Sequence, residues 1–221
     1  MRTFLFDLDG TLVDPVMGIV EACQYTLDKM GRPVPEAREL HWIIGPPIRT
    51  SFRQLLGDGS DVEEGVRLYR ERYAAGGMCN ATVYEGIEQA LSELQQGDTT
   101  MFVCTAKLTT FATRIVEHFG LGGYFASIYG AELAGRFENK ADLIAHMIET
   151  EGFDPELACM VGDRSHDVIA AAAHGIPTLG ALWGYGSRDE LTSAGAAAIV
   201  ERPHHLPAAV AQLDAFRTAK A

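Results

Sequence analysis

Positive charge is scarce in this chain. Its 221 residues include 18 lysines and arginines against 30 aspartates and glutamates, which gives a formal net charge of −12. Sequence-independent binding to DNA or RNA needs a basic surface that displaces counterions, and docking on anionic lipid also needs positive charge. We therefore expect neither a nucleic acid polymer nor a membrane as a partner. A small phosphorylated molecule stays open as a ligand, because a metal ion and a few donors can neutralise one phosphate.

Cysteine and long apolar runs are also scarce. The four cysteines are Cys23, Cys79, Cys104 and Cys159. No two of them have metal-ligand spacing such as C-x-x-C, and we interpret them as reduced thiols. The apolar run in MRTFLFDLDG is broken by Asp7 and Asp9, so it is too short for the core of a signal peptide. No stretch approaches the length of a membrane span. We expect a cytoplasmic protein, either a monomer or a homodimer.

Apolar side chains, in contrast, make up 47% of the chain, and their order indicates the fold class. A short apolar run at the start predicts a buried strand. After residue 83, strands alternate with helices, which is typical of a parallel sheet with helices on both faces. The expected strands are 3–8, 99–104, 125–129, 157–161, 176–182 and 197–200.

Residues 16–83 have a different pattern. Apolar side chains recur at helical spacing over 16–30, 36–43, 47–56 and 61–75, and we expect no strand among them. Strand 3–8 therefore finds its partners only after residue 83. We predict a doubly wound, Rossmann-like α/β core formed by 1–15 and 84–221, with a small all-helical unit, 16–83, inserted after the first strand.

Polar residues follow four of the predicted strands. In open parallel sheets, ligands bind at the carboxyl ends of the strands, so these residues are expected to meet. They are the segments D-L-D-G-T (7–11), V-C-T-A-K (103–107) and G-D-R-S-H-D (162–167), together with Lys140 at the start of a helix.

Each of these residues also has an ordinary interpretation. Asp7 and Asp9 could form a solvated turn, but two carboxylates on one side of a strand tip favour a cation such as Mg²⁺. Thr105 could be a plain strand-end residue, or it could hold phosphate with nearby backbone N–H groups, including that of Ala106. Lys140 is unfavourably placed at a helix start unless an anion lies nearby. Asp163 and Asp167 could cap a helix, which does not exclude metal binding.

These four motifs, in this order and over the whole chain, resemble those of the haloacid dehalogenase superfamily. The helical insert resembles the cap of its phosphoglycolate phosphatase-like branch, and parts of the motifs also resemble proteins described as nucleotidases. The resemblance implies a HAD-type core and a magnesium-dependent phosphatase. It further implies that the substrate is a small phosphorylated metabolite such as phosphoglycolate or a nucleoside monophosphate.

The resemblance also implies residue roles. Asp7 is the nucleophile that forms an aspartyl-phosphate, and Asp9 is the general acid and base. Mg²⁺ is held by Asp7, the Asp9 carbonyl and Asp163, with Asp167 coordinating less directly or through water. The transferred phosphoryl group is bound by Thr105, Ala106 and Lys140.

Other activities use the same architecture. Dehalogenases of the superfamily lack the second aspartate, so Asp9 favours a phosphatase. A phosphonate hydrolase would need a cap lysine, and Lys29 is the only lysine in the helical block. A sugar phosphomutase remains open, although such enzymes tend to have valine where this chain has Thr11. A phosphoaspartate-forming regulatory module remains open as well.

The segment 41–49 (HWIIGPPIR) is expected to face the substrate. Within it, Arg49 could bind a substrate carboxylate or a second phosphate, or it could lie on the solvent face. A second group of arginines, Arg67, Arg70 and Arg72, is expected to form a solvated helix face with nearby glutamates.

Overall fold

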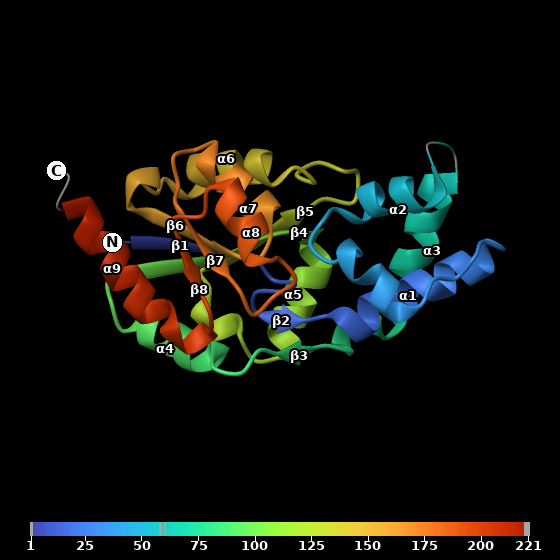
Figure 1. Ribbon diagram of the computed structural model, residues 1–221, viewed down its shortest axis with the longest axis horizontal. Helices are drawn as coiled ribbons and strands as arrows, with labels where there is room; N and C mark the ends of the chain where they lie inside the picture. Colours follow the sequence, from blue (N-terminus) through green and yellow to red (C-terminus); the bar gives the residue numbers. More distant parts are fainter. Residues whose placement is uncertain (1, 58, 60, 219–221) are drawn as a thin grey trace.

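A six-stranded parallel sheet forms the larger part of the molecule (Figure 1). The computed structural model describes residues 2–57, 59 and 61–218, with side chains up to residue 213. The strand order is β5-β4-β1-β6-β7-β8. Their bounds are β1 Arg2–Phe6, β4 Thr99–Leu108, β5 Ser127–Ala131, β6 Ala158–Gly162, β7 Thr178–Ala181 and β8 Ala198–Val200. The predicted doubly wound α/β fold is confirmed, and the chain changes direction across the sheet beside β1, where such folds bind ligands.

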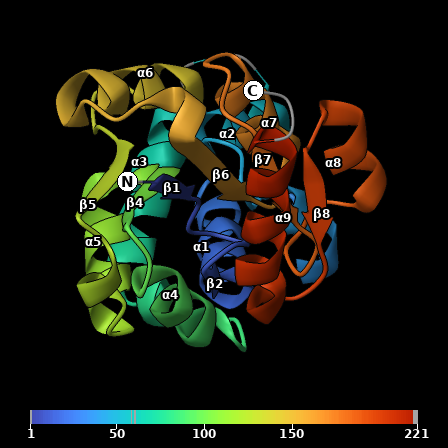
Figure 2. The ribbon, with the colours of Figure 1, turned by 90° about the vertical axis from the view of Figure 1, so that its left-hand side faces the viewer.

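Helices cover both faces of the sheet (Figure 2). One face carries α6 (Lys140–Glu151) and α7 (Ser165–Ala172), and the other carries α4 (Ile87–Gln95), α5 (Thr109–His118) and α9 (Leu206–Thr218). Side chains of β1 alternate between the two layers: Phe4 and Phe6 join one apolar cluster and Leu5 joins the other. Burial on both sides explains why this strand reads as a continuous apolar run.

The inserted helices form a cap beyond the carboxyl ends of the strands, at the right of Figure 1. They are α1 (Val16–Lys29), α2 (Ile48–Leu56) and α3 (Asp61–Ala75), with the 3₁₀ turns η1 (Ala37–Ile43) and η2 (Gly77–Cys79). The cap has buried apolar side chains of its own, including Leu27, Phe52, Val66 and Tyr69. This placement puts the cap over the end of the sheet where the predicted site residues lie.

A small antiparallel ribbon joins the two ends of the insert. It pairs β2 (Val13–Asp14) with β3 (Thr82–Val83). The sequence interpretation expected no strand within 16–83, and β3 corrects it. Two residues per strand are too few to give a period-2 pattern. The ribbon lies beside the boundaries proposed for the insert, after residues 15 and 83, so both connections to the core are held together.

Two further details differ from the sequence expectations. β4 continues to Leu108, past the predicted end at residue 104, because Leu108 pairs with Ala131 after a shift of register. Helix α8 (Arg188–Ala194) was not predicted: only Leu191 in it is buried, so it has almost no apolar periodicity. Among the described residues, none of the helices combines the length and apolarity needed to cross a membrane.

Candidate active site

The first aspartate of the D-x-D pair is fixed at the tip of β1. The backbone N–H of Asp7 donates to the carbonyl of Val161 in β6 at 2.9 Å, and the N–H of Leu8 donates to Asp7 Oδ1 at 2.8 Å. The side chain of Asp7 is buried. The tip of the central strand is therefore anchored to its neighbour, with the carboxylate in a defined orientation.

Three aspartates converge at this point. Carboxylate oxygens of Asp7, Asp163 and Asp167 all lie within 4.8 Å of one another, and all three residues are buried. Asp163 accepts hydrogen bonds from Thr11 Oγ1 at 3.1 Å and from the N–H of Tyr185 at 2.8 Å. Burial, together with the charges of Asp167 and Asp7, raises the pKa of Asp163 well above its usual range. Such a cluster favours a positive group among the carboxylates.

Two glycines allow this close approach. Gly10 has φ +83°, and a Cβ built on it would lie 2.3 Å from Asp163 Oδ2. A Cβ on Gly162 would lie 2.3 Å from Cγ of Asp167. Any side chain at either position would displace a carboxylate, so the glycines of D-G-T and G-D are part of the site's construction.

Lys140 supplies positive charge to the cluster. It is the first residue of α6 and is buried. Its Nζ lies 3.0 Å from Asp7 Oδ1 and also donates to Asp167 Oδ1. Burial alone would lower its pKa, but the charges of Asp167 and Asp7 outweigh burial and raise it. These two anions explain a lysine at a helix start, as the sequence suggested.

The second aspartate, Asp9, is held by a lysine that the sequence analysis missed. Lys107 Nζ lies 2.5 Å from Asp9 Oδ2 and donates to the hydroxyl of Tyr73, a cap residue, at 2.9 Å. Burial raises the pKa of Asp9, and Lys107 partly opposes the rise. A signal was present: Lys107 lies two residues after Thr105, in the segment V-C-T-A-K that already supplied a candidate residue. No sequence pattern pointed to Tyr73.

The charges at the strand tips do not balance. Four buried carboxylates, of Asp7, Asp9, Asp163 and Asp167, face two lysines, which is a formal excess of two negative charges when all four are ionised. All the acidic groups offer oxygen donors, which Mg²⁺ prefers. The residues present therefore fit a divalent magnesium ion in both charge and donor type.

A pocket with a cavity volume of about 60 Å³ lies between the core and the cap. From the core it is lined by Asp7, Asp9 and the segment 105–108, so the predicted Thr105 and Ala106 lie in it. From the cap, the segment 41–49 contributes Ile43, Gly45, Pro46, Pro47 and Ile48. The substrate-facing segment expected from the sequence therefore does line the pocket.

Arg49 is engaged in ion pairs at the rim. Its guanidinium binds Glu63 of α3, with Nε 2.7 Å from Oε1, and also pairs with Glu138, which precedes α6 in the core. The Arg49 side chain is 14% exposed, so it does not lie on the solvent face. The role in substrate binding suggested by the sequence stays a prediction.

The arginines of α3 do not form one solvated face. Arg67 pairs with Glu64 and Glu71, as expected. Arg72 instead reaches Glu21 of α1. Arg70 corrects the sequence expectation, because it turns inward and lines the pocket. Periodicity alone could not distinguish these arginines, since all three fall among acidic neighbours.

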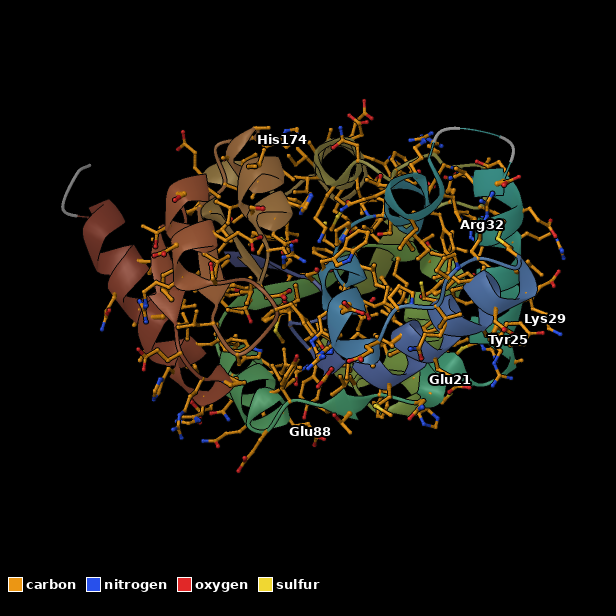
Figure 3. All side chains as sticks on the ribbon, turned by 45° about the vertical axis from the view of Figure 1, so that its right-hand side comes forward. Glu21, Tyr25, Lys29, Arg32, Glu88 and His174 are labelled. Atoms are coloured by element: carbon orange, nitrogen blue, oxygen red, sulfur yellow. The ribbon has the colours of Figure 1, made fainter. Side chains whose placement is uncertain are left out.

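The single lysine in the cap sequence, Lys29, lies far from the catalytic aspartates. Figure 3 shows Lys29 with Glu21 and Tyr25 at the outer end of the cap, and Lys29 is exposed. This position gives no support to a phosphonate hydrolase with a cap lysine. Cys104 is buried beside the site, and burial raises the pKa of its thiol to about 12, which disfavours it as a nucleophile.

Known proteins share this sequence and architecture. A 5'-nucleotidase of Pseudomonas aeruginosa is 40% identical over 188 residues, which are 85% of each chain. The tyrosine-protein kinase PtkA of Mycobacterium tuberculosis is 41% identical over 84% of this chain, which spans only 63% of that protein. A phosphoglycolate phosphatase of Aquifex aeolicus is 31% identical over 84% of this chain and 86% of its own.

A crystal structure described as a predicted phosphatase from Clostridium acetobutylicum superimposes with a TM-score of 0.92. It is 36% identical and covers 96% of this chain and 98% of its own. The family model of the haloacid dehalogenase-like hydrolases matches residues 4–181. That range includes the acidic cluster, both lysines of the site and the whole cap. The chain belongs to the haloacid dehalogenase-like hydrolases and is phosphatase-like within them.

Proposed function

We propose that this protein hydrolyses phosphate monoesters of small metabolites through a phosphorylated Asp7. The observation that carries the proposal is the meeting of Asp163, Asp167 and Lys140 with Asp7, which lines the pocket between core and cap. Within the described part of the chain, the Leu8 N–H and Lys140 Nζ both contact Oδ1 of the Asp7 carboxylate. Oδ2 is therefore left for attack on phosphorus. A carboxylate nucleophile divides one difficult displacement into two easier steps.

Asp9 suits the proton transfers of both steps. Its carboxylate lines the same pocket as Asp7, and Lys107 fixes its orientation. We assign to it protonation of the departing alcohol and then activation of the water that hydrolyses the aspartyl-phosphate. Thr105 and the backbone at Ala106 bind phosphoryl oxygens, and Lys140 offsets their charge.

Asp7, the carbonyl of Asp9 and Asp163 are the residues that would hold Mg²⁺, with Asp167 in support. A bound Mg²⁺ would neutralise the phosphoryl oxygens and help align the ester. The cap lines its side of the pocket largely with apolar side chains, which limits the access of bulk water to the reaction. Phosphoglycolate and nucleoside monophosphates are the substrates that we propose.

Phosphate release from p-nitrophenyl phosphate tests the proposal. We expect Mg²⁺-dependent release that EDTA removes and added Mg²⁺ restores. We expect Asp7→Asn to lower it by more than about 10³-fold, because a covalent nucleophile has no substitute. Asp28→Asn, an exposed aspartate of the cap, is the matched control. Unchanged release by Asp7→Asn contradicts the assignment of the nucleophile.

Sustained phosphate release distinguishes a phosphatase from the two alternative activities. A phosphomutase would move phosphate between positions of a hexose without releasing it. A regulatory module would keep a long-lived phosphoaspartate without turnover.

A further inference from the structure

Arg70 is a cation without a carboxylate partner in the wall of the catalytic pocket. It lies on α3 of the cap and lines the cavity that also contains Asp7 and Asp9. Its Nε is buried and has no hydrogen-bond partner. Its Nη1 reaches only the carbonyl of Leu133, at 3.5 Å. Within the described part of the chain, no carboxylate oxygen lies within ion-pair distance of it.

The nearby glutamates are already occupied by another arginine. Glu138 lines the same pocket, but it pairs with Arg49. Glu63, about two turns before Arg70 on the helix, also pairs with Arg49. Arg49 is thus held by two carboxylates and Arg70 by none. Burial, and then the charge of Arg49, lower the pKa of Arg70, and the charges of Glu138 and Glu63 oppose this only in part.

A partly buried guanidinium without a partner is costly, and an anion that enters the pocket relieves the cost. The planar group offers paired N–H donors that match a carboxylate or phosphate. The lining of the same pocket also includes the apolar side chains of Ile43, Ile48 and Phe111. Arg70 lines the same pocket as Asp7 and Asp9, so one small molecule can present its phosphate to the aspartates and a second anion to Arg70.

We propose that Arg70 forms a subsite for a second anionic group of the substrate, a carboxylate on a short phosphate monoester. The inference rests on the proposed phosphatase function and sharpens it. A nucleoside monophosphate carries no second anion, so it would leave Arg70 without a partner. The ester that fits carries its phosphate at the Asp7 end and its carboxylate at the Arg70 end.

Two esters of equal length test the subsite. 2-Phosphoglycolate carries a carboxylate two atoms from the phosphate oxygen, and 2-hydroxyethyl phosphate carries a neutral hydroxyl there. The measured quantity is the ratio of kcat/KM for the first ester to that for the second. Both are assayed on the same preparation, so the fraction of folded enzyme cancels from the ratio.

We expect the unmodified protein to prefer 2-phosphoglycolate, and Arg70→Gln to lower the ratio by about tenfold to a hundredfold, as loss of a charged hydrogen bond implies. The change should fall mainly on KM. Arg70→Lys should keep part of the preference. Arg67→Gln, an arginine of the same helix paired with Glu64 and Glu71, is the control and should keep the whole ratio.

The outcomes separate the subsite from the function. If the unmodified protein releases phosphate but prefers AMP or 2-hydroxyethyl phosphate, the subsite is refuted and the phosphatase stands. An equal loss for both esters in Arg70→Gln also refutes the subsite. If none of these esters nor p-nitrophenyl phosphate is hydrolysed, the proposed function itself fails.

Discussion

The core side and the cap side of the pocket differ in how their charges are matched. On the core side, Lys140 and Lys107 each contact carboxylates, and negative charge remains in excess. On the cap side, the charged residue in the described lining is Arg70, and the rest is apolar or aromatic. The core can therefore bind a cation and a phosphoryl group, whereas the cap contacts the rest of the substrate. Catalysis and selectivity are encoded in different stretches of the chain, and each prediction below tests one side against the other.

Among the variants compared below, the largest effect is expected from Asp9→Asn on the core side. Steady-state phosphate release should fall by about 10²- to 10⁴-fold, because the general acid and base is lost. p-Nitrophenyl phosphate should still give a rapid burst of one equivalent of nitrophenolate, since this leaving group needs no proton. Stopped-flow absorbance separates the burst from turnover. A fall of less than tenfold in turnover contradicts the role of Asp9.

The residues of the core side could be predicted from the sequence because they lie at the carboxyl ends of strands that pair in parallel. Asp7, Thr105 and Asp163 each follow or end a buried apolar run, and parallel pairing then places them together. Lys140 was recognisable as an anomaly at a helix start. The parallel sheet itself needed no motif, since the alternation of helices and strands implies it, whereas the strand order came only from the structure.

The residues of the cap side could not be predicted in the same way. Tyr73 and Arg70 lie on one helix whose apolar pattern shows which residues are buried, but not which of them face another domain. Arg49 pairs with Glu63 and Glu138 whereas Arg70 pairs with neither, and the contact with Glu138 depends on how the cap docks on the core. The apolar periodicity of the cap and of the core reports how each packs internally, and it contains little information about contacts between them.

The second effect, in order of size, concerns the buried lysine of the core. Lys140→Met leaves Asp7 and Asp167 facing each other without a cation, and we expect a loss of about 3–5 kcal/mol in the free energy of unfolding without metal. Denaturant unfolding measures the loss. Mg²⁺ should raise the melting temperature of the variant more than that of the unmodified protein, since more negative charge is left uncompensated. The exposed Lys29→Met is the control, expected within about 0.5 kcal/mol. A stability equal to the control would show that the ion pairs are dispensable.

A smaller effect is expected where the two sides meet. Tyr73→Phe removes the hydroxyl that binds Lys107 but keeps the ring, whose centroid lies 4.7 Å from Lys107 Nζ. We expect kcat to fall by about twofold to tenfold, the equivalent of one net hydrogen bond. Tyr69→Phe is the matched control, because Tyr69 stacks on Tyr73 at 5.5 Å without bonding Lys107. Equal effects of the two variants would mean that the hydroxyl of Tyr73 does not position Asp9 through Lys107.

The smallest effect is expected at the rim. Arg49→Gln breaks the ion pair between cap and core, and the stability loss should not exceed about 1 kcal/mol. A double-mutant cycle with Glu138→Gln isolates the pair. kcat/KM for 2-phosphoglycolate and for 2-hydroxyethyl phosphate should fall by the same factor. A change in their ratio would instead place Arg49 in contact with the substrate carboxylate.

The most direct measurement is the mass of the peptide that contains Asp7 after the reaction is stopped in acid. Asp9→Asn is mixed with p-nitrophenyl phosphate and Mg²⁺, quenched within the burst and digested, so that the covalent intermediate is caught before its slow hydrolysis. The mechanism predicts a gain of one phosphoryl group on Asp7, with none in Asp7→Asn. Release of nitrophenolate and phosphate together, with that peptide unmodified throughout, would contradict the account.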